Sequence, residues 1–472
     1  MRGLKRWWLW CVAVLLVCLF VWLRFYNINK SFFFQNDAGR DMLVLWDWEK
    51  LGKIPILGPQ TSVFPINQSS WYFYLLYPGF LLLNAQPISA NYTLAGFYIA
   101  SFVAGLYWFR REKRMQILLL LSFFLISVHP QFITQNRTVL NPSFVGMFLV
   151  ISITSFVMWL QESKLRFLIV YAFAMSLAVS FNYSAAPVLL ATIIYLVFTK
   201  RKHLLNAVGI NIISLSLVNL TTIAFEIKHN FLISRSLFER GIRIQSTENI
   251  SLNSRFSNIV NYGFSLGSNE LNLLAFLLIS IVVVLVLYSK KASLLSKQLG
   301  ILWLLAMVLS IILPTQIFPH YIFGTMTLVF LFVSSLPPKI SLPLIGTMAL
   351  IYLNPTQISS YFMPSPRTVG QMESCFEKVC RDYKEPMYMT VQANFHPYHY
   401  GPEHRFIMKK KGCDVRNIED PGQNASIMAV VMDGSEFEAG KTSYSELITF
   451  GKAFEIKRYN CQKNFGVTIL KR

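Results

Sequence analysis

Long apolar runs, separated by short polar turns, constrain this chain more than any other feature of its sequence. Hydrophobic residues make up 54% of its 472 residues, and charged residues only 14%. A predominantly apolar run of about 20 residues can cross a bilayer as a helix. The sequence therefore predicts a polytopic α-helical membrane protein with about eleven transmembrane helices, at residues 7–26, 88–109, 115–129, 143–161, 167–182, 186–199, 204–225, 272–289, 298–313, 320–336 and 340–354.

Basic residues outnumber acidic ones by 43 to 23, for a formal net charge of +20. Most of them lie in short clusters between apolar runs, which is typical of cytoplasmic loops and argues against a nucleic-acid partner. The basic and apolar N-terminal segment lacks a small-residue cleavage site, so we expect a retained first helix with a cytoplasmic N-terminus. The clusters are Lys5/Arg6, Arg110–Arg114, Lys164/Arg166, Lys200–Lys202, Lys290/Lys291/Lys297 and Lys339.

If all these clusters face the cytoplasm, two crossings separate each consecutive pair in a multi-pass protein of the cell membrane. The apolar run at residues 71–83 is too short to cross, so we expect an interfacial or re-entrant helix there. The predicted extracytoplasmic regions are then the first outer loop 27–87, the turns 129–142, 182–183 and 314–320, the outer loop 226–271, and the tail after residue 354.

Acidic residues are scarce, yet several of them gather in the first outer loop. If this segment is helical, Asp37 and Asp41 lie one turn apart on the same face, with Arg40 beside them as a candidate for binding the substrate or its phosphate. Carboxylates at an apolar boundary suit a general base or a cation site. A solvated surface helix is the alternative interpretation of such a pair.

The other predicted outer turns carry further polar candidates for contact with a substrate or a phosphate. Arg137 could bind a phosphate or lie at the headgroup level, and Asn141 could contact substrate or begin the next helix. His320 and Tyr321 begin a predicted crossing, where a histidine is also often simply interfacial. Glu226 and Lys228 open the longest of these loops, where the glutamate could equally cap a helix or pair with the lysine.

The tail, residues 355–472, changes character because charges of both signs return and the apolar runs shorten. Alternating segments predict strands at 387–393, 425–433, 454–460 and 465–472, and helices at 402–410 and 443–450. We therefore expect a small extracytoplasmic α/β domain, with acceptor recognition as its role. Its cysteines are predicted to form two disulfides, with three pairings open, and zinc binding is less favoured by their spacing; they are Cys375, Cys380, Cys413 and Cys461.

Several motifs of this chain, in this order and on one predicted side, resemble those of the GT-C glycosyltransferases. The resemblance is to the broad family that holds protein O-mannosyltransferases and the bacterial aminoarabinose transferase, and it covers roughly residues 1–355. The segments that carry it are QNDAGRDM with the trailing LGKIPILGP, then SSWYFYLLYPGFLL, TQNRTVLNPSF, FEIKHNF and PHY.

The resemblance implies a GT-C transmembrane catalytic domain at residues 1–354 and a polyprenyl-phosphate-linked sugar donor used on the outer face of the membrane. It also implies that Asp37 is the catalytic base. Where the family has Asp-Glu, this chain has Asp37-Ala38, so Asp41 is a candidate assisting acid and a divalent cation is left open.

The resulting prediction is an inverting glycosyltransferase that acts on a lipid, glycan or protein acceptor, with Arg137 and His320 stabilising the departing polyprenyl phosphate. The alternatives are a polytopic transporter and a lipid-linked oligosaccharide polymerase or ligase. A transporter is expected to show internal repeats and ionisable residues inside its crossings. The predicted crossings here are nearly free of charge, which favours the enzyme.

Overall fold

The computed structural model describes residues 7–61, 66–240, 251–312, 318–393, 399–420, 422, 424–440, 442–462 and 464–472. The predicted basic pair Lys5/Arg6 lies outside these residues. The chain forms two compact units. The helical unit comprises Met1–Tyr26, Pro55–Leu76 and Asn91–Tyr361, and the sheet unit comprises Asn27–Ile54, Tyr77–Ala90 and Phe362–Arg472.

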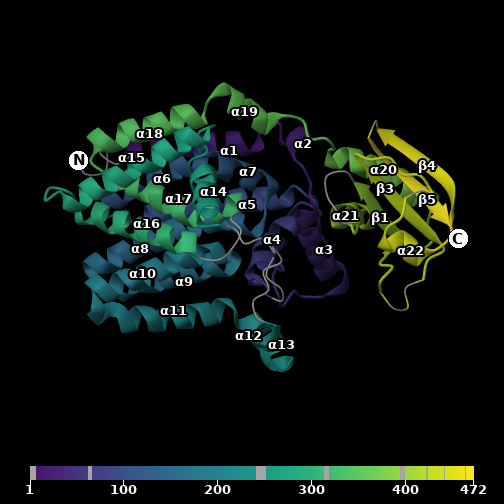
Figure 1. The fold of residues 1–472 in the computed structure, drawn as a ribbon, viewed down its shortest axis with the longest axis horizontal. Coiled ribbons are helices and arrows are strands. Elements are labelled where there is room, and N and C mark those ends of the chain that lie inside the picture. Colours follow the sequence, from purple (N-terminus) through teal and green to yellow (C-terminus); the bar gives the residue numbers. More distant parts are fainter. Residues whose placement is uncertain are drawn as a thin grey trace. The chain divides into compact units, whose positions relative to one another are not determined.

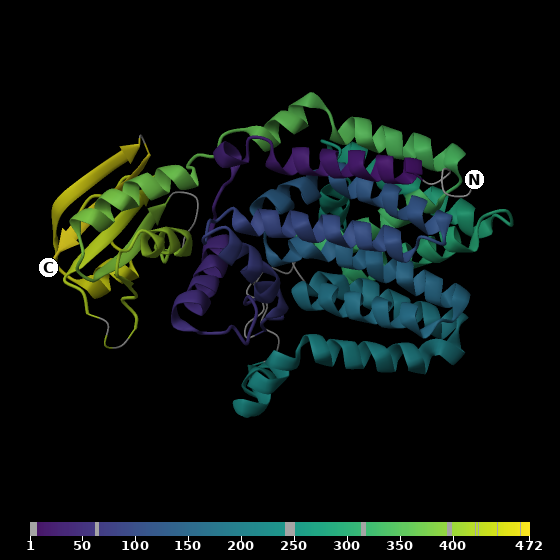
Figure 2. The same ribbon diagram turned by 180° about the vertical axis from the view of Figure 1, so that it is seen from behind.

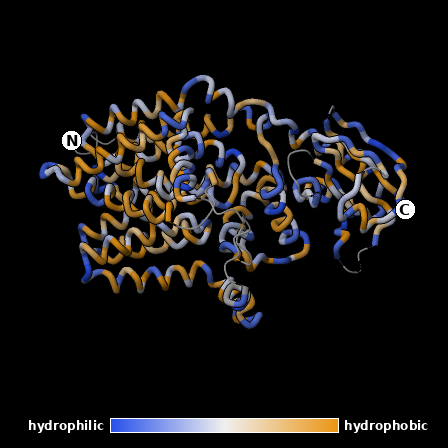
Figure 3. Tube along the Cα trace, in the orientation of Figure 1, coloured by the Kyte–Doolittle hydropathy of each residue, from blue (hydrophilic) through white to orange (hydrophobic). Residues whose placement is uncertain are grey.

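The helical unit is a bundle of apolar helices (Figures 1 and 2), and hydrophobic residues run along most of their length (Figure 3). Its longer helices are α1 (Trp7–Phe25), α5 (Ser89–Trp108), α6 (Lys113–Val128), α8 (Val145–Glu162), α9 (Leu165–Phe181), α10 (Ala186–Thr199), α11 (Leu204–Val218), α15 (Asn269–Tyr288), α16 (Leu294–Ile312), α17 (Phe323–Ser335) and α18 (Pro338–Tyr352). Shorter elements at its turns are α7 (Pro130–Thr138), α12 (Leu220–Lys228), α13 (Leu232–Arg240), α14 (Leu252–Phe264), α19 (Pro355–Phe362), η2 (Asn141–Phe144), η3 (Tyr183–Ala185), η4 (Arg201–His203) and η5 (Pro319–Ile322).

A helix occupies each range in which the sequence predicts a crossing. By length and composition, four described helical segments can each cross a membrane, namely Trp7–Ser31, Asn141–Glu162, Asn269–Tyr288 and Leu294–Ile312. Two bent pairs raise this number to six if each pair is one span: α6 with α7, at 70°, and α11 with α12, at 68°. The predicted crossing at 204–225 is thus broken near Asn219, whose amide donates to the Ser180 hydroxyl at 2.8 Å. The number of crossings remains a prediction.

The turns that carry the described basic clusters gather at one end of the helical unit. Arg114, Lys291 and Pro338, from three different turns, line one cavity. The Arg166 guanidinium lies 5.7 Å from the centre of the Trp108 ring, which joins the start of α9 to the end of α5. This grouping agrees with the topology predicted from charge, because loops on one side of a membrane must meet at one end of the bundle.

The sheet unit contains α2 (Ile28–Ser31) and α3 (Asn36–Leu51) from the first predicted outer loop, together with the tail. The predicted interfacial run forms α4 (Trp71–Leu82). In the tail, α20 (Val369–Asp382), α21 (Pro402–Lys410) and α22 (Ser445–Phe450) accompany five strands: β1 (Met387–Ala393), β2 (Val415–Arg416), β3 (Ile427–Asp433), β4 (Phe454–Gln462) and β5 (Phe465–Lys471). All four predicted strands and both predicted helices are present, whereas α20 and β2 were not predicted.

The five-stranded sheet has the order β2-β1-β3-β5-β4. Strands β1, β2 and β3 are parallel, while β5 runs antiparallel to both β3 and β4. The central strand β3 is buried along its whole length, because side chains on both of its faces are covered, and the edge strand β4 is mostly exposed. Tyr388, Val430 and Leu470 pack with Phe450 of α22 on one face of the sheet.

Two disulfides join α20 to its neighbours in the tail. Cys375 pairs with Cys461 of β4, and Cys380 pairs with Cys413 after α21. The structure thus selects one of the three pairings that the sequence leaves open. Disulfides persist in oxidising compartments, which is consistent with a tail outside the cytoplasm.

Replacing Cys380 and Cys413 together by serine is expected to lower the free energy of unfolding of the sheet by about 2–4 kcal/mol, because the crosslink restricts the unfolded chain. The measurement is hydrogen exchange of the β3 amides in the full-length protein. The matched control is the double replacement of Cys11 and Cys18, which are free thiols in α1. Equal exchange rates in the two double variants would contradict this prediction.

Candidate active site

Helix α3 places the predicted acidic pair on its first two turns. Its first turn carries Asp37 and its last turn Lys50, each at the end of the helix dipole that its charge favours. The Asp37 side chain is 56% exposed, whereas Asp41 is 1% exposed and lies on the buried face with Met42 and Leu45. The two carboxylates predicted to act together therefore have different environments.

Arg40 lies between the two carboxylates. Its Nη1 donates to Asp37 Oδ1 at 3.1 Å, and its Nε and Nη2 donate to Asp41 Oδ1 at 3.0 and 2.8 Å. Asp41 thus anchors the guanidinium, and the guanidinium orients the exposed Asp37 carboxylate. A divalent cation shared by both acids would have to displace Arg40. Among the described residues, no group of three or more His, Cys, Asp or Glu side chains is arranged to hold a metal ion.

Helix α3 packs directly against α21 of the tail, within the sheet unit. Phe406 of α21 contacts Phe34 and Trp46 edge-on, with ring centres 5.9 and 6.0 Å apart. At Gly39 the two helices approach so closely that a Cβ atom there would overlap the backbone of Glu403. The tail therefore supports the helix that carries the acidic pair, an association that the sequence analysis did not predict. The sequence signal that could have indicated this contact is Gly39 itself, because an isolated glycine inside a helical pattern often marks close packing.

Gly39→Ala is expected to destabilise the packing of α3 on α21 by about 1–3 kcal/mol, since the added methyl group has no space beside rigid backbone. The measurement is hydrogen exchange of the α3 amides. Gly370→Ala is the matched control in the same unit, because a Cβ at Gly370 meets no atom within 4 Å. Protection of α3 that is equal in both variants would contradict the close approach.

A buried charge cluster fixes the segment that leads into α3. Arg367 is 2% exposed, and its Nη1 donates to the Phe34 carbonyl at 3.1 Å. Its Nε contacts Asp433 Oδ2 at 2.5 Å, and its Nη2 contacts Glu403 Oε1 at 3.1 Å. Burial alone would raise the pKa of Asp433, but the hydrogen bond from His404 and the charge of Arg367 hold this pKa below its usual value.

Within the helical unit, the predicted outer turns meet at one end of the bundle. His129 Nε2 lies 2.7 Å from the Gly263 carbonyl at the end of α14. The Asn141 amide donates to the Phe181 carbonyl at 2.6 Å, so Asn141 ties the start of η2 to the end of α9. The Tyr183 hydroxyl donates to the Asn67 carbonyl at 3.0 Å. Segments far apart in the sequence thus meet at this end of the helical unit.

Arg137 and Glu226 make structural contacts at this end. Nη1 of the buried Arg137 donates to the carbonyls of Leu23 and Arg24 at 3.2 and 2.9 Å, so it satisfies the C-terminal end of α1. The Glu226 carboxylate accepts from the backbone amides of Ile233 and Ser234 at 2.8 and 2.9 Å and caps α13. Capping is one of the alternatives that the sequence left open for Glu226.

The remaining candidates lie on the surface of the helical unit. His320 is half-buried in η5, stacked on Phe318 and edge-on to Tyr321. Lys228 is exposed at the end of α12. A cavity of about 330 Å³ is lined by Asn67, Tyr183 and Glu226 among others. The direct roles predicted for Arg40, Arg137, Asn141, Glu226, Lys228, His320 and Tyr321 remain predictions.

Comparison of the whole chain with known proteins gives a similarity of structure without a similarity of sequence. No protein-family model and no curated protein matches the chain. The structure is similar to ArnT from Cupriavidus metallidurans bound to undecaprenyl phosphate, with a TM-score of 0.62 at 10% identity over 97% of both chains. The apo state of that ArnT gives 0.63 at 11% identity, again over 97% of both chains. The chain has the GT-C fold.

A weaker similarity links the chain to arabinofuranosyltransferase AftD from Mycobacteria, with a TM-score of 0.46 at 11% identity. It covers 99% of this chain and 40% of AftD. The similarity to ArnT extends through nearly the whole chain, so it includes the tail as well as the helices. The GT-C fold expected from the motifs of residues 1–355 is confirmed, and the chain is a membrane protein of this fold.

Proposed function

We propose that this protein transfers a sugar from a polyprenyl-phosphate donor to an acceptor on the outer face of the cytoplasmic membrane, with inversion at the anomeric carbon. The observation that carries this proposal is the exposed Asp37 carboxylate, held by Arg40 on the first turn of α3, in a chain with the GT-C fold. One of the similar ArnT structures is bound to undecaprenyl phosphate, which supports a polyprenyl phosphate as the carrier here.

In the proposed reaction, Asp37 accepts the proton of an acceptor hydroxyl, and the hydroxyl oxygen attacks the anomeric carbon of the donor. The bond from this carbon to the phosphate oxygen breaks, and the polyprenyl phosphate departs with the electron pair. Arg40 remains beside Asp37 and keeps its carboxylate oriented. Basic and polar groups of the outer turns, with His320 and Tyr321 as candidates, would stabilise the phosphate.

The topology proposed with this function places the N-terminus in the cytoplasm and the tail outside. The gathering of the basic turns at one end of the helical unit supports it, and so do the two disulfides of the tail. Donor and acceptor would then meet on the side to which the lipid carrier presents its sugar. The acceptor is a lipid, a glycan or a protein.

The test is turnover of a panel of polyprenyl-phosphate sugars by the purified protein in detergent, with a cell-envelope extract as acceptor. We expect release of polyprenyl phosphate together with incorporation of labelled sugar into the extract. A transporter has no compartments to connect in detergent and would give neither product. A polymerase or ligase would instead release a polyprenyl pyrophosphate from oligosaccharide-linked donors. The identity of the released lipid therefore distinguishes such an enzyme from the proposed glycosyltransferase.

A further inference from the structure

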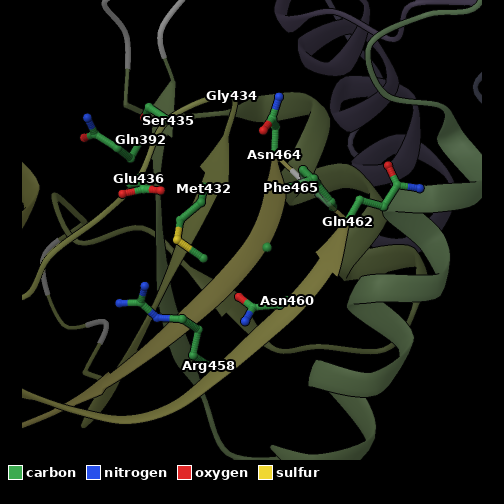
Figure 4. Close-up of a pocket in the computed structure, with 11 residues that line it drawn as sticks. Gln392, Met432, Gly434, Ser435, Glu436, Arg458, Asn460, Gln462, Asn464 and Phe465 are labelled. Carbon is green, nitrogen blue, oxygen red and sulfur yellow. The ribbon is translucent and has the colours of Figure 1, made fainter.

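A polar cavity of about 910 Å³ opens on the tail sheet at the carboxyl ends of the parallel strands β1 and β3 (Figure 4). This volume lies within the range of about 300–1,000 Å³ that is usual for small-molecule sites. The carboxyl edge of parallel strands is also where open α/β sheets commonly bind ligands. All residues that line the cavity belong to the tail, so it is separate from α3.

Two buried polar atoms in this cavity lack hydrogen-bond partners in the described part of the chain. They are Oε1 of Gln392, near the end of β1, and Oγ of Ser435, which follows β3. A buried polar atom without a partner costs about 1–3 kcal/mol. Such atoms beside a cavity therefore indicate that a bound polar molecule supplies the missing hydrogen bonds. The amide side chains of Asn460, Gln462 and Asn464 also line the cavity.

The described positive charge at this cavity, that of Arg458, is already paired. Nε and Nη2 of Arg458 donate to the two carboxylate oxygens of Glu455 at 3.0 and 2.7 Å, and Nη2 also donates to the Phe437 carbonyl at 3.0 Å. The guanidinium is thus engaged by a carboxylate, and Glu436 adds a second negative group to the lining. Among the described residues of the lining, an anionic ligand would therefore meet no unpaired positive charge.

We propose that this cavity binds a neutral oligosaccharide. Each sugar hydroxyl both donates and accepts a hydrogen bond, and each amide side chain offers the same two functions. Met432 and Phe465 also line the cavity, but they are only 8% and 4% exposed, so they offer a small apolar area to the carbon atoms of a sugar ring. The ligand is either a glycan that serves as acceptor or the sugar portion of a lipid-linked donor. The proposal does not depend on the transfer reaction at Asp37.

The test is binding of neutral tri- to pentasaccharides of glucose, galactose, mannose and rhamnose to the full-length protein, measured by calorimetry in a detergent without a sugar headgroup. We expect at least one of them to bind, and Gln392→Ala and Asn460→Ala each to weaken its binding about tenfold for a lost hydrogen bond. Asn424→Ala is the matched control, because Asn424 is an exposed amide of the same tail outside the cavity.

Hydrogen exchange of the β3 amides verifies that each variant is folded, and Asn460→Asp replaces Asn460→Ala if the latter unfolds. Asp37→Asn is expected to bind the same oligosaccharide as the wild type does. If a polyprenyl-phosphate monosaccharide competes with the oligosaccharide, the cavity binds the sugar portion of the donor. If it does not compete, the cavity binds an acceptor glycan. Three results would each overturn the proposal: no binding by the panel, tighter binding of anionic saccharides, or equal affinity in the cavity variants and the control.

Discussion

Asp37→Asn is expected to lower the rate of sugar transfer by about 10²–10⁴-fold, because an amide cannot accept the proton of the acceptor hydroxyl. The substitution keeps the size of the side chain, and an exposed position on the first turn of α3 tolerates an amide. The fold should therefore be unaffected. The measurement is kcat and KM for release of polyprenyl phosphate, and we expect the loss to fall on kcat.

The matched control for this prediction is Asp47→Asn, which removes a carboxylate from the same helix that is 37% exposed, against 56% for Asp37. Asp47 faces Lys409 at 3.8 Å and does not belong to the Arg40 pair, so its replacement should leave kcat nearly unchanged. If Asp37→Asn keeps wild-type turnover while Asp41→Asn is inactive, the base must be reassigned to Asp41. If both variants turn over normally, the α3 carboxylates have no role in proton transfer.

Arg367→Met is expected to lower the free energy of unfolding of the sheet unit by about 3–5 kcal/mol. The substitution leaves Asp433 and Glu403 buried at 6% and 3% side-chain exposure without their guanidinium partner. It also removes the hydrogen bond to the Phe34 carbonyl, so the entry to α3 should loosen. Hydrogen exchange of the β3 and α3 amides measures both effects in the same sample.

Lys457→Met is the matched control, because Lys457 forms an ion pair with Asp382 at 2.6 Å on the exposed edge strand β4. An exposed pair of this kind contributes about 0–1 kcal/mol. Combining Arg367→Met with Asp433→Asn should recover part of the loss, since one buried charge is then removed. Equal destabilisation by Arg367→Met and Lys457→Met would show that the buried cluster contributes no more to the free energy of unfolding than the exposed ion pair does.

The same cluster implies a pH dependence with a definite sign. The pKa of Asp433 is lower in the folded protein than its ordinary value. The stability that it contributes is therefore present above the unfolded pKa of about 3.9 and is lost as the pH falls through the lower folded value. Acid should thus weaken the sheet unit below about pH 4, and less so in Asp433→Asn.

The tail supports helix α3, a structural role that differs from the acceptor recognition expected for it. Arg367, Glu403 and Phe406, all from the tail, contact the segment around α3. If the tail positions the first turn of α3, substitutions far from Asp37 in the sequence are expected to impair the proposed transfer. Activity lost through Arg367→Met or Gly39→Ala would be of this indirect kind.

The sequence by itself determined the apolar helices, four strands and two helices of the tail, and the acidic pair Asp37 and Asp41, because each depends on residues close together in the chain. Hydropathy periods and alternation are local signals. Only the tertiary structure decided which disulfides form, that Asp41 is buried while Asp37 is exposed, and that Arg137 and Glu226 satisfy helix ends. Arg367 and Phe34 are 333 residues apart, and no local pattern specifies a pairing that arises only when the folded chain brings two distant segments together.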